Sequence, residues 1–193
     1  MTDVSAQPIV ETHFPVGRDL TWEDLQTIPD EDYWRYELVD GSLLVSPGPE
    51  LIHQRCAGKL FLLLTAACPE HLEVLFAPFD FTPETGFVLQ PDVMVLDPER
   101  AERQRTHVAP LLAVEVLSPG TRTKDRVLKR AVYAEYGVAS YWIVDPIVPS
   151  LLALELVGDA YNVVAEVRGE EAAALERPFP VTITPARLVD RSR

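Results

Sequence analysis

The feature that constrains the fold most is a strand, a helix and a second strand that follow one another between residues 111 and 144. Leu111–Leu117 and Tyr141–Val144 are mainly apolar runs of strand length. Residues 123–136 have the length and pattern of a helix, and Gly137 is placed to end it. Short links between such elements predict a right-handed βαβ crossover with parallel strands. We therefore expect an α/β core.

Two β-hairpins are expected beside this unit. Asp40-Gly41 joins two β-prone runs, residues 36–39 and 42–45. That dipeptide accepts the positive φ angles of a tight turn, which makes it a strong hairpin signal. Residues 151–167 read as a second hairpin around Gly158.

The remaining elements follow from periodicity and turn residues. Residues 50–67 are predicted to be a helix, with Thr21 capping an earlier helical turn. Residues 72–81 and 87–96 are predicted strands, and 181–189 a closing strand or helical turn. Apolar residues of the first long helix recur at spacings of three and four and are expected to face the core: Ile52, Cys56, Leu60, Leu63, Leu64 and Ala67.

Length and composition bound the class of protein. A chain of 193 residues suits one domain, which we place at residues 19–193 after a loosely ordered arm, residues 1–18. Apolar stretches fall short of the ~20 residues that a membrane helix needs, and the N-terminus lacks the pattern of a secretory signal. Cys56 and Cys68 have no partners at metal spacing and are expected to be reduced and partly buried. These features predict a cytoplasmic protein without a membrane segment.

The net charge of −13 argues against tight binding of a nucleic acid backbone by the whole surface. Basic residues are nevertheless uneven along the chain. One group is Arg100, Arg103 and Arg105, and the other is Arg122, Lys124, Arg126, Lys129 and Arg130. Either group could form a local basic patch, or the residues could simply be solvated.

Two carboxylates stand in otherwise buried surroundings. Glu115 is the one charged residue within Leu111–Leu117, and an ionised carboxylate there needs a compensating cation or donors. Asp92 opens the apolar run 93–96, and 23 residues separate it from Glu115, enough to place the two strands side by side. Such a pair makes an all-oxygen site suited to Mg²⁺ or Mn²⁺. A salt bridge that fixes the sheet is the alternative for Glu115.

Lys129 is the basic residue best placed to reach Glu115. On the predicted helix 123–136, Asp125, Lys129 and Tyr133 share one face. Lys129 lies at the margin of the apolar stripe, which we assign to Leu128, Ala131, Val132 and Tyr136. The alternative is an exposed pair between Asp125 and Lys129, which would stabilise the helix by only ~0.3–0.5 kcal/mol.

Several motifs resemble the Uma-two family of the restriction-endonuclease-like PD-(D/E)XK group. They occur in the expected order: Tyr36–Gly41, Pro91–Val93, Glu115–Pro119, Asp125 with Lys129 and Tyr133, Gly137-Val138, and Tyr141–Pro146. The resemblance covers about residues 20–160. It implies a central mixed β-sheet flanked by helices, a homodimer, and a Mg²⁺-dependent nuclease site with Asp92 and Glu115 as metal ligands.

One position departs from that pattern, because Leu117 stands where the nuclease motif has lysine. Lys129 could supply the missing ammonium from the helix. By analogy Glu37 becomes a further metal ligand, although an exposed hairpin glutamate needs no function. The implied mechanism is phosphodiester hydrolysis, with Asp92, Glu115 and the Val116 carbonyl holding Mg²⁺ and Lys129 stabilising developing charge. DNA is expected ahead of RNA as the substrate.

Other readings stay open. A restriction-fold module that binds nucleic acid or protein without cutting would suit the acidic surface and Leu117. A homo-oligomeric scaffold that uses sheet edges and the 151–167 hairpin is a third possibility. His53 is interpreted as a partly buried structural histidine, and His13, His71 and His107 are isolated. Motifs of zinc proteases, P-loop hydrolases, esterases and Rossmann enzymes are absent from the sequence.

Overall fold

A computed structural model of the chain describes residues 18–28, 34–118 and 124–191, with side chains of the third segment from residue 127. The predicted N-terminal arm therefore lies almost wholly outside the described residues. The side chains of Arg122, Lys124, Asp125 and Arg126 lie outside them too, so neither the Asp125–Lys129 pair nor most of the second basic group can be placed.

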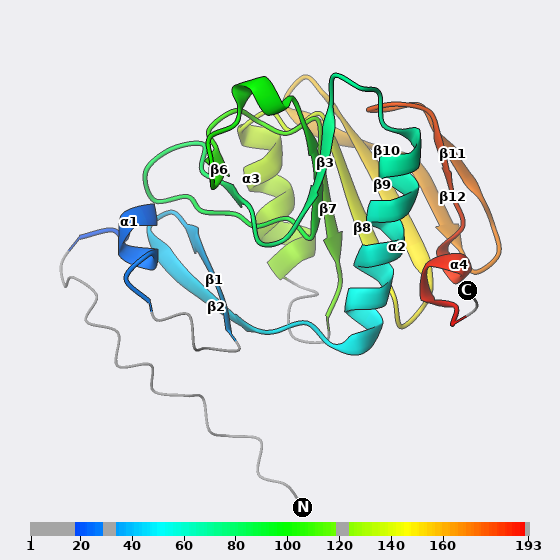
Figure 1. Cartoon of the computed structure of the whole chain (residues 1–193), viewed down its shortest axis with the longest axis horizontal. Helices are drawn as coiled ribbons and strands as arrows, with labels where there is room; N and C mark the ends of the chain where they lie inside the picture. Colours follow the sequence, from blue (N-terminus) through cyan, green and yellow to red (C-terminus); the bar gives the residue numbers. More distant parts are fainter. Residues whose placement is uncertain (1–17, 29–33, 119–123, 192–193) are drawn as a thin grey trace, which may run out of the picture.

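The centre of the fold is a six-stranded mixed sheet in the order β10-β9-β8-β7-β5-β3 (Figure 1). β7 and β8 are parallel, and every other neighbouring pair in this sheet is antiparallel. The strands are β3 (Glu73–Phe76), β5 (Val93–Leu96), β7 (Leu112–Val116), β8 (Ser140–Asp145), β9 (Ser150–Val157) and β10 (Ala160–Arg168). The sheet confirms the predicted central mixed sheet, the parallel crossover and the 151–167 hairpin.

Helices cover both faces of this sheet (Figure 1). α2 (Leu51–Ala67) packs through Cys56, Leu60 and Leu64 on the face formed by alternate residues such as Val93 and Val114. The opposite face carries the segment from the π-helical turn η2 (Lys124–Lys129) through α3 (Arg130–Glu135), where Val132 and Tyr133 are buried. β11 (Ala173–Leu175), β12 (Val181–Ile183) and α4 (Pro185–Val189) close the core on the α2 side.

The N-terminal hairpin stands beside the main sheet, at the blue end of the chain in Figure 1. β1 (Trp34–Val39) and β2 (Ser42–Pro47) pair around Asp40-Gly41, where both residues have positive φ, as the turn signal predicts. Before it lies α1 (Trp22–Leu25), and Thr21 forms a capping box with Asp24. A backbone bridge from Leu38 to Val88 ties β1 to the rest of the molecule.

Two predicted strands are shorter than the sequence suggests. Residues 72–81 divide into β3 and β4 (Asp80–Phe81), and β4 pairs not with β5 but with β6 (Arg105–Thr106). Residues 87–92 lie outside the sheet, where Val88 and Leu89 make only isolated bridges. Pro78 and Pro91 interrupt both runs because proline offers no N–H to a ladder. A short 3₁₀ turn, η1 (Pro98–Arg100), follows β5.

The predicted core-facing stripes of the two long helices are also partly wrong. Leu63 is 40% exposed although the 50–67 pattern places it inward. In the second helix Leu128 is 37% exposed, Ala131 is exposed, and Lys129 is fully enclosed instead of marginal. The reason is the π-helical turn η2, in which i→i+5 hydrogen bonding gives less rotation per residue than the α-helical 100°. Among the described helices, none is long and apolar enough to cross a membrane.

Candidate active site

Five segments of the chain bring charged side chains together at one end of the sheet. The residue preceding β5 contributes Asp92, β7 contributes Glu115, and the end of η2 contributes Lys129. β1 adds Arg35 and Glu37, and the first turn of α2 adds His53. Apart from Arg35, which is half-buried, these side chains are buried. Burying so many charges is costly unless they pair, so their mutual contacts determine what the site can do.

Asp92 is held by three donors. Its Oδ1 accepts from Arg35 Nη1 at 2.8 Å, and its Oδ2 lies 3.1 Å from His53 Nε2 and accepts from the Val116 N–H at 2.7 Å. The β5–β7 ladder runs only to the Val93–Val114 pair, and beyond that pair the carboxylate accepts from the β7 backbone. The position of Asp92 is therefore fixed to the strand that carries Glu115.

Glu115 and Lys129 form the contact that the sequence predicts. Lys129 Nζ lies 2.9 Å from Glu115 Oε1, and the Tyr133 hydroxyl donates to the same oxygen at 2.8 Å. The two residues are 2% and 3% exposed, so water screens the pair little. Leu117, at the usual lysine position, is buried in the core beneath α3. An ammonium thus reaches the carboxylate from the helix and not from the strand.

Glu37 is the second acidic partner of the lysine. Its Oε2 lies 2.9 Å from Lys129 Nζ, and its Oε1 accepts from the Gln90 N–H at 2.8 Å. The residue is 5% exposed, so the alternative of an exposed hairpin glutamate is wrong. Periodicity could not reveal this burial, because the β1–β2 hairpin turns one face towards the site only after it docks through Leu38 and Val88.

Sequence reasoning missed Arg35 and underestimated His53. The predicted hairpin starts at Tyr36, so Arg35 stood outside every predicted element. His53 is buried like the structural histidine that we expected, but its ring contacts Asp92. A possible signal was the start of the first long helix, where an apolar stripe carries a histidine in place of a hydrophobic residue. The partner 39 residues away could not be read from the sequence.

The electrostatics of the cluster favour the ionised forms of Asp92 and Glu37. Burial by itself would raise the pKa of Asp92, but Arg35, His53 and the Val116 N–H together hold it below its ordinary value. Burial likewise opposes ionisation of Glu37, whose pKa is nevertheless lowered by Lys129, Arg35 and the Gln90 N–H. Burial and the nearby Glu115 and Glu37 raise the pKa of Tyr133, which stays a neutral donor. Among the side chains that the structure describes, three carboxylates of this cluster face two permanent cations, Arg35 and Lys129.

Two described basic residues outside this cluster, Arg105 and Arg130, contact other groups of the protein. Arg105 pairs with Glu23 and Glu102, at 3.5 and 3.1 Å, and lies over the Trp22 ring at 4.2 Å. Arg130 donates to the Tyr161 carbonyl.

The donor set suits a hard divalent cation. Carboxylate oxygens on adjacent strands and a backbone carbonyl are ligands that Mg²⁺ and Mn²⁺ prefer, and Mg²⁺ commonly uses one or two carboxylates with water and substrate oxygens. In the part of the chain that the structure describes, no group of three His, Cys, Asp or Glu side chains is close enough together to hold a metal ion. The arrangement therefore fits a two-carboxylate site, not a closed protein cage.

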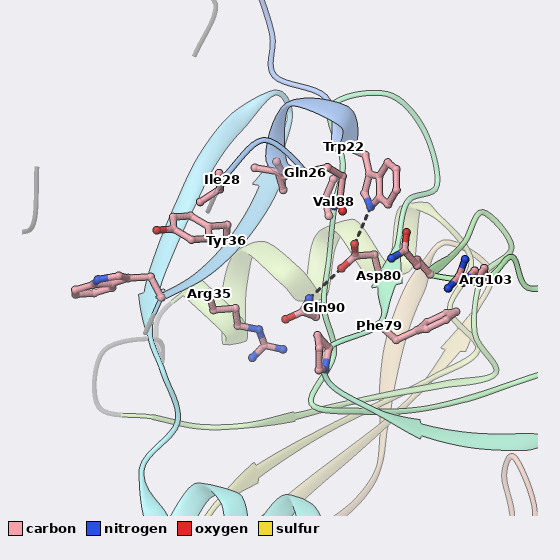
Figure 2. Close-up of a pocket in the computed structure, with 14 residues that line it drawn as sticks. Trp22, Gln26, Ile28, Arg35, Tyr36, Phe79, Asp80, Val88, Gln90 and Arg103 are labelled. Atoms are coloured by element: carbon pink, nitrogen blue, oxygen red, sulfur yellow. Dashed lines mark hydrogen bonds between the residues drawn. The ribbon is translucent and has the colours of Figure 1, made fainter. Parts of the chain in front are cut away.

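Three cavities meet at the Arg35 side chain. A small one of about 40 Å³ is bounded by Asp92, Glu115, Glu37 and Lys129. A larger cavity of about 650 Å³ opens beside α2, and a third of about 450 Å³ lies under α1. In the third, Trp22 Nε1 and Gln90 Nε2 both donate to Asp80, at 2.7 and 3.0 Å (Figure 2).

Comparison with known proteins supports the fold. A solved structure whose description reads "putative nuclease belonging to DUF820", from Anabaena variabilis, superposes with a TM-score of 0.66. It is 16% identical in sequence, and the match covers 82% of this chain and 89% of that chain. Together with the mixed sheet and its flanking helices, this likeness defines the fold class as restriction-endonuclease-like. No curated protein matches the chain.

A protein-family model makes the assignment specific. The model of the Uma2 family, described as "Putative restriction endonuclease", matches residues 22–188. The chain belongs to the Uma2 family, as its motifs indicate.

Proposed function

We propose that this protein is a Mg²⁺- or Mn²⁺-dependent endonuclease that hydrolyses phosphodiester bonds of nucleic acid, DNA ahead of RNA. The observation that carries the proposal is the buried contact between Glu115 and Lys129 beside Asp92. The three side chains supply two carboxylates and one ammonium, which are the groups that this chemistry needs. Family membership supports a nuclease in general, and the metal and the substrate are our inference.

In this proposal Asp92, Glu115 and the Val116 carbonyl would hold the metal ion, and Glu37 would stay paired with Lys129. A divalent ion there supplies Lewis-acid polarisation of the phosphate and lowers the pKa of water. Lys129 Nζ, which lies between two carboxylates, is positioned to donate to a phosphoryl oxygen as negative charge develops. The Tyr133 hydroxyl and the Gln90 N–H orient Glu115 and Glu37.

A noncatalytic module that binds nucleic acid or protein is the second candidate. The observation that favours it is that each of the three carboxylates already contacts Arg35 or Lys129, so the cluster is held together as an ion network without a metal. That candidate requires no metal. The homodimer remains part of our proposal and comes from the family resemblance alone.

Cleavage of supercoiled plasmid and single-stranded DNA with Mg²⁺, Mn²⁺ or EDTA tests the proposal. We expect metal-dependent cutting by the wild type that falls by at least ~100-fold in both Glu115→Ala and Lys129→Ala. Glu135→Ala, an exposed acidic position on α3, is the matched control and should cut normally. Full activity of a folded Glu115→Ala variant would contradict the assignment of the site.

A further inference from the structure

The cavity of about 650 Å³ beside α2 directly adjoins the candidate active site. It shares Arg35, His53 and Asp92 with the small cavity bounded by the carboxylates. Its size falls within the range of small-ligand pockets, ~300–1,000 Å³. A group that fills it would therefore lie next to any phosphodiester held at Asp92 and Glu115.

Aromatic and apolar side chains line most of this cavity. Trp34 comes from β1, Phe61 and Leu62 from α2, and Phe76 from the end of β3. The rings of Phe61 and Phe76 pack edge to face with centroids 4.9 Å apart. Phe76 is 58% exposed and Leu62 is 66% exposed, so the described chain leaves this wall uncovered. Flat rings that face an open cavity are the usual platform for unstacked nucleobases.

Polar atoms without a partner stand where the cavity meets the active site. Arg35 Nε and Nη2 are buried and have no hydrogen-bond partner in the described structure, although Nη1 binds Asp92. His53 Nδ1 also lacks a partner there. Buried guanidinium donors without an acceptor are costly, and a phosphodiester oxygen would satisfy them. Arg55, also at the cavity, has no ion-pair partner among the described residues and adds a cation.

We propose that the cavity beside α2 receives one unstacked nucleobase, so that the substrate of the active site is single-stranded or locally unpaired nucleic acid. The inference rests on the proposed function, because it names the substrate of that same site. Charge supports it, because a net charge of −13 argues against tight binding of a duplex backbone by the whole surface. A single strand can instead be held by stacking and a few local cations.

Fluorescence anisotropy of wild-type protein in EDTA with labelled 12-nucleotide probes tests the inference without cleavage. We expect the single strand to bind at least about tenfold more tightly than a duplex of the same sequence. Phe76→Ala and Phe76→Leu should weaken single-strand binding by roughly 5- to 150-fold, the range measured for loss of one stacked base. Phe76→Trp should retain binding because it keeps a flat ring.

Two controls separate stacking from other effects. Leu63→Ala removes an exposed apolar side chain of α2 outside this cavity and should bind normally. A probe of abasic deoxyribose phosphates should bind wild type as weakly as Phe76→Ala binds the normal strand, and Phe76→Ala should weaken it no further. Far-UV circular dichroism verifies that each variant is folded.

The outcomes distinguish this inference from the nuclease proposal. If the protein binds the single strand in a way that depends on the bases and on Phe76 but never cuts it, the nucleobase-binding proposal holds and the nuclease proposal is wrong. If the protein cuts duplex with metal and Phe76→Ala leaves this cutting unchanged, the nuclease proposal holds and the nucleobase-binding proposal is wrong. Equal affinity for duplex, single strand and abasic probe, or no binding of any probe, would also overturn the cavity.

Discussion

Lys129 is the residue on which the candidate site depends most. Its ammonium lies 2.9 Å from both Glu37 and Glu115 and is almost fully buried. Removing one member of a buried charge network leaves its partners uncompensated, which commonly costs more than the network contributes. Stability and catalysis are therefore coupled at this position, and variants must be measured for both.

We predict that Lys129→Met lowers the free energy of unfolding by about 3–5 kcal/mol. Adding Glu37→Gln to the same chain should recover part of that loss, because it removes one of the two carboxylates left without a cation. The coupling from the double-mutant cycle, by urea unfolding, should be about 0.5–3 kcal/mol. Strictly additive changes would show that the two side chains do not interact in solution.

The lowered pKa values of Asp92 and Glu37 predict that the protein loses stability in acid. Both pKa values are lowered by folding from ordinary values of 3.8 and 4.5. Their contribution is fully present above those values and is lost as pH falls through them towards the folded pKa. The free energy of unfolding should therefore decrease below about pH 5, and less steeply in Asp92→Asn than in wild type. Urea titrations from pH 7 to pH 3 measure both slopes; equal slopes would refute the contribution of Asp92.

At the scale of elements, the β1–β2 hairpin is the part that completes the site. It contributes Arg35 and Glu37, of which only Glu37 lies within the strands predicted from the sequence. The turn depends on Gly41, which has φ +66° and whose added Cβ would meet the Asp19 Cβ at 2.4 Å.

Gly41→Ala should therefore destabilise the protein by about 1–3 kcal/mol and reduce any activity that depends on the hairpin. The matched control is Gly58→Ala in α2, where an added Cβ meets nothing within 4 Å. That change should stabilise the protein by about 0.5–1 kcal/mol, because alanine favours a helix interior. Urea unfolding compares the two variants. A Gly41→Ala protein as stable as the wild type would mean that the turn tolerates other geometries.

The sequence predicted elements well where local pattern determines them, and poorly where distant contacts do. The βαβ unit and both hairpins carry their own turn residues, so their positions are correct. The Glu115–Lys129 contact was also predictable, because a lone charge in a buried strand requires a partner nearby. The division of residues 72–96, the π-helical turn and the contacts of Arg35 and His53 with Asp92 depend on packing between segments far apart in sequence. No local pattern encodes them.

At the scale of the whole molecule, the enclosed cations and the cavities lie in the same region. A strongly acidic chain places its few enclosed cations at one end of the sheet, and the three cavities there meet at Arg35. We propose that residues 19–193 form one folding unit around this site. Thermal unfolding followed by near- and far-UV circular dichroism should then give coincident single transitions. Two separate transitions would contradict a single unit.

The central claim is that the buried carboxylates hold a metal ion beside Arg35 and Lys129. Electron paramagnetic resonance of Mn²⁺ titrated into the folded protein measures this directly, since free and bound Mn²⁺ give different signals. The account predicts at least one bound Mn²⁺ in wild type, competed by Mg²⁺, and none in Asp92→Asn or Glu115→Gln. Wild type that leaves all Mn²⁺ free, or binding that both substitutions leave unchanged, would contradict it.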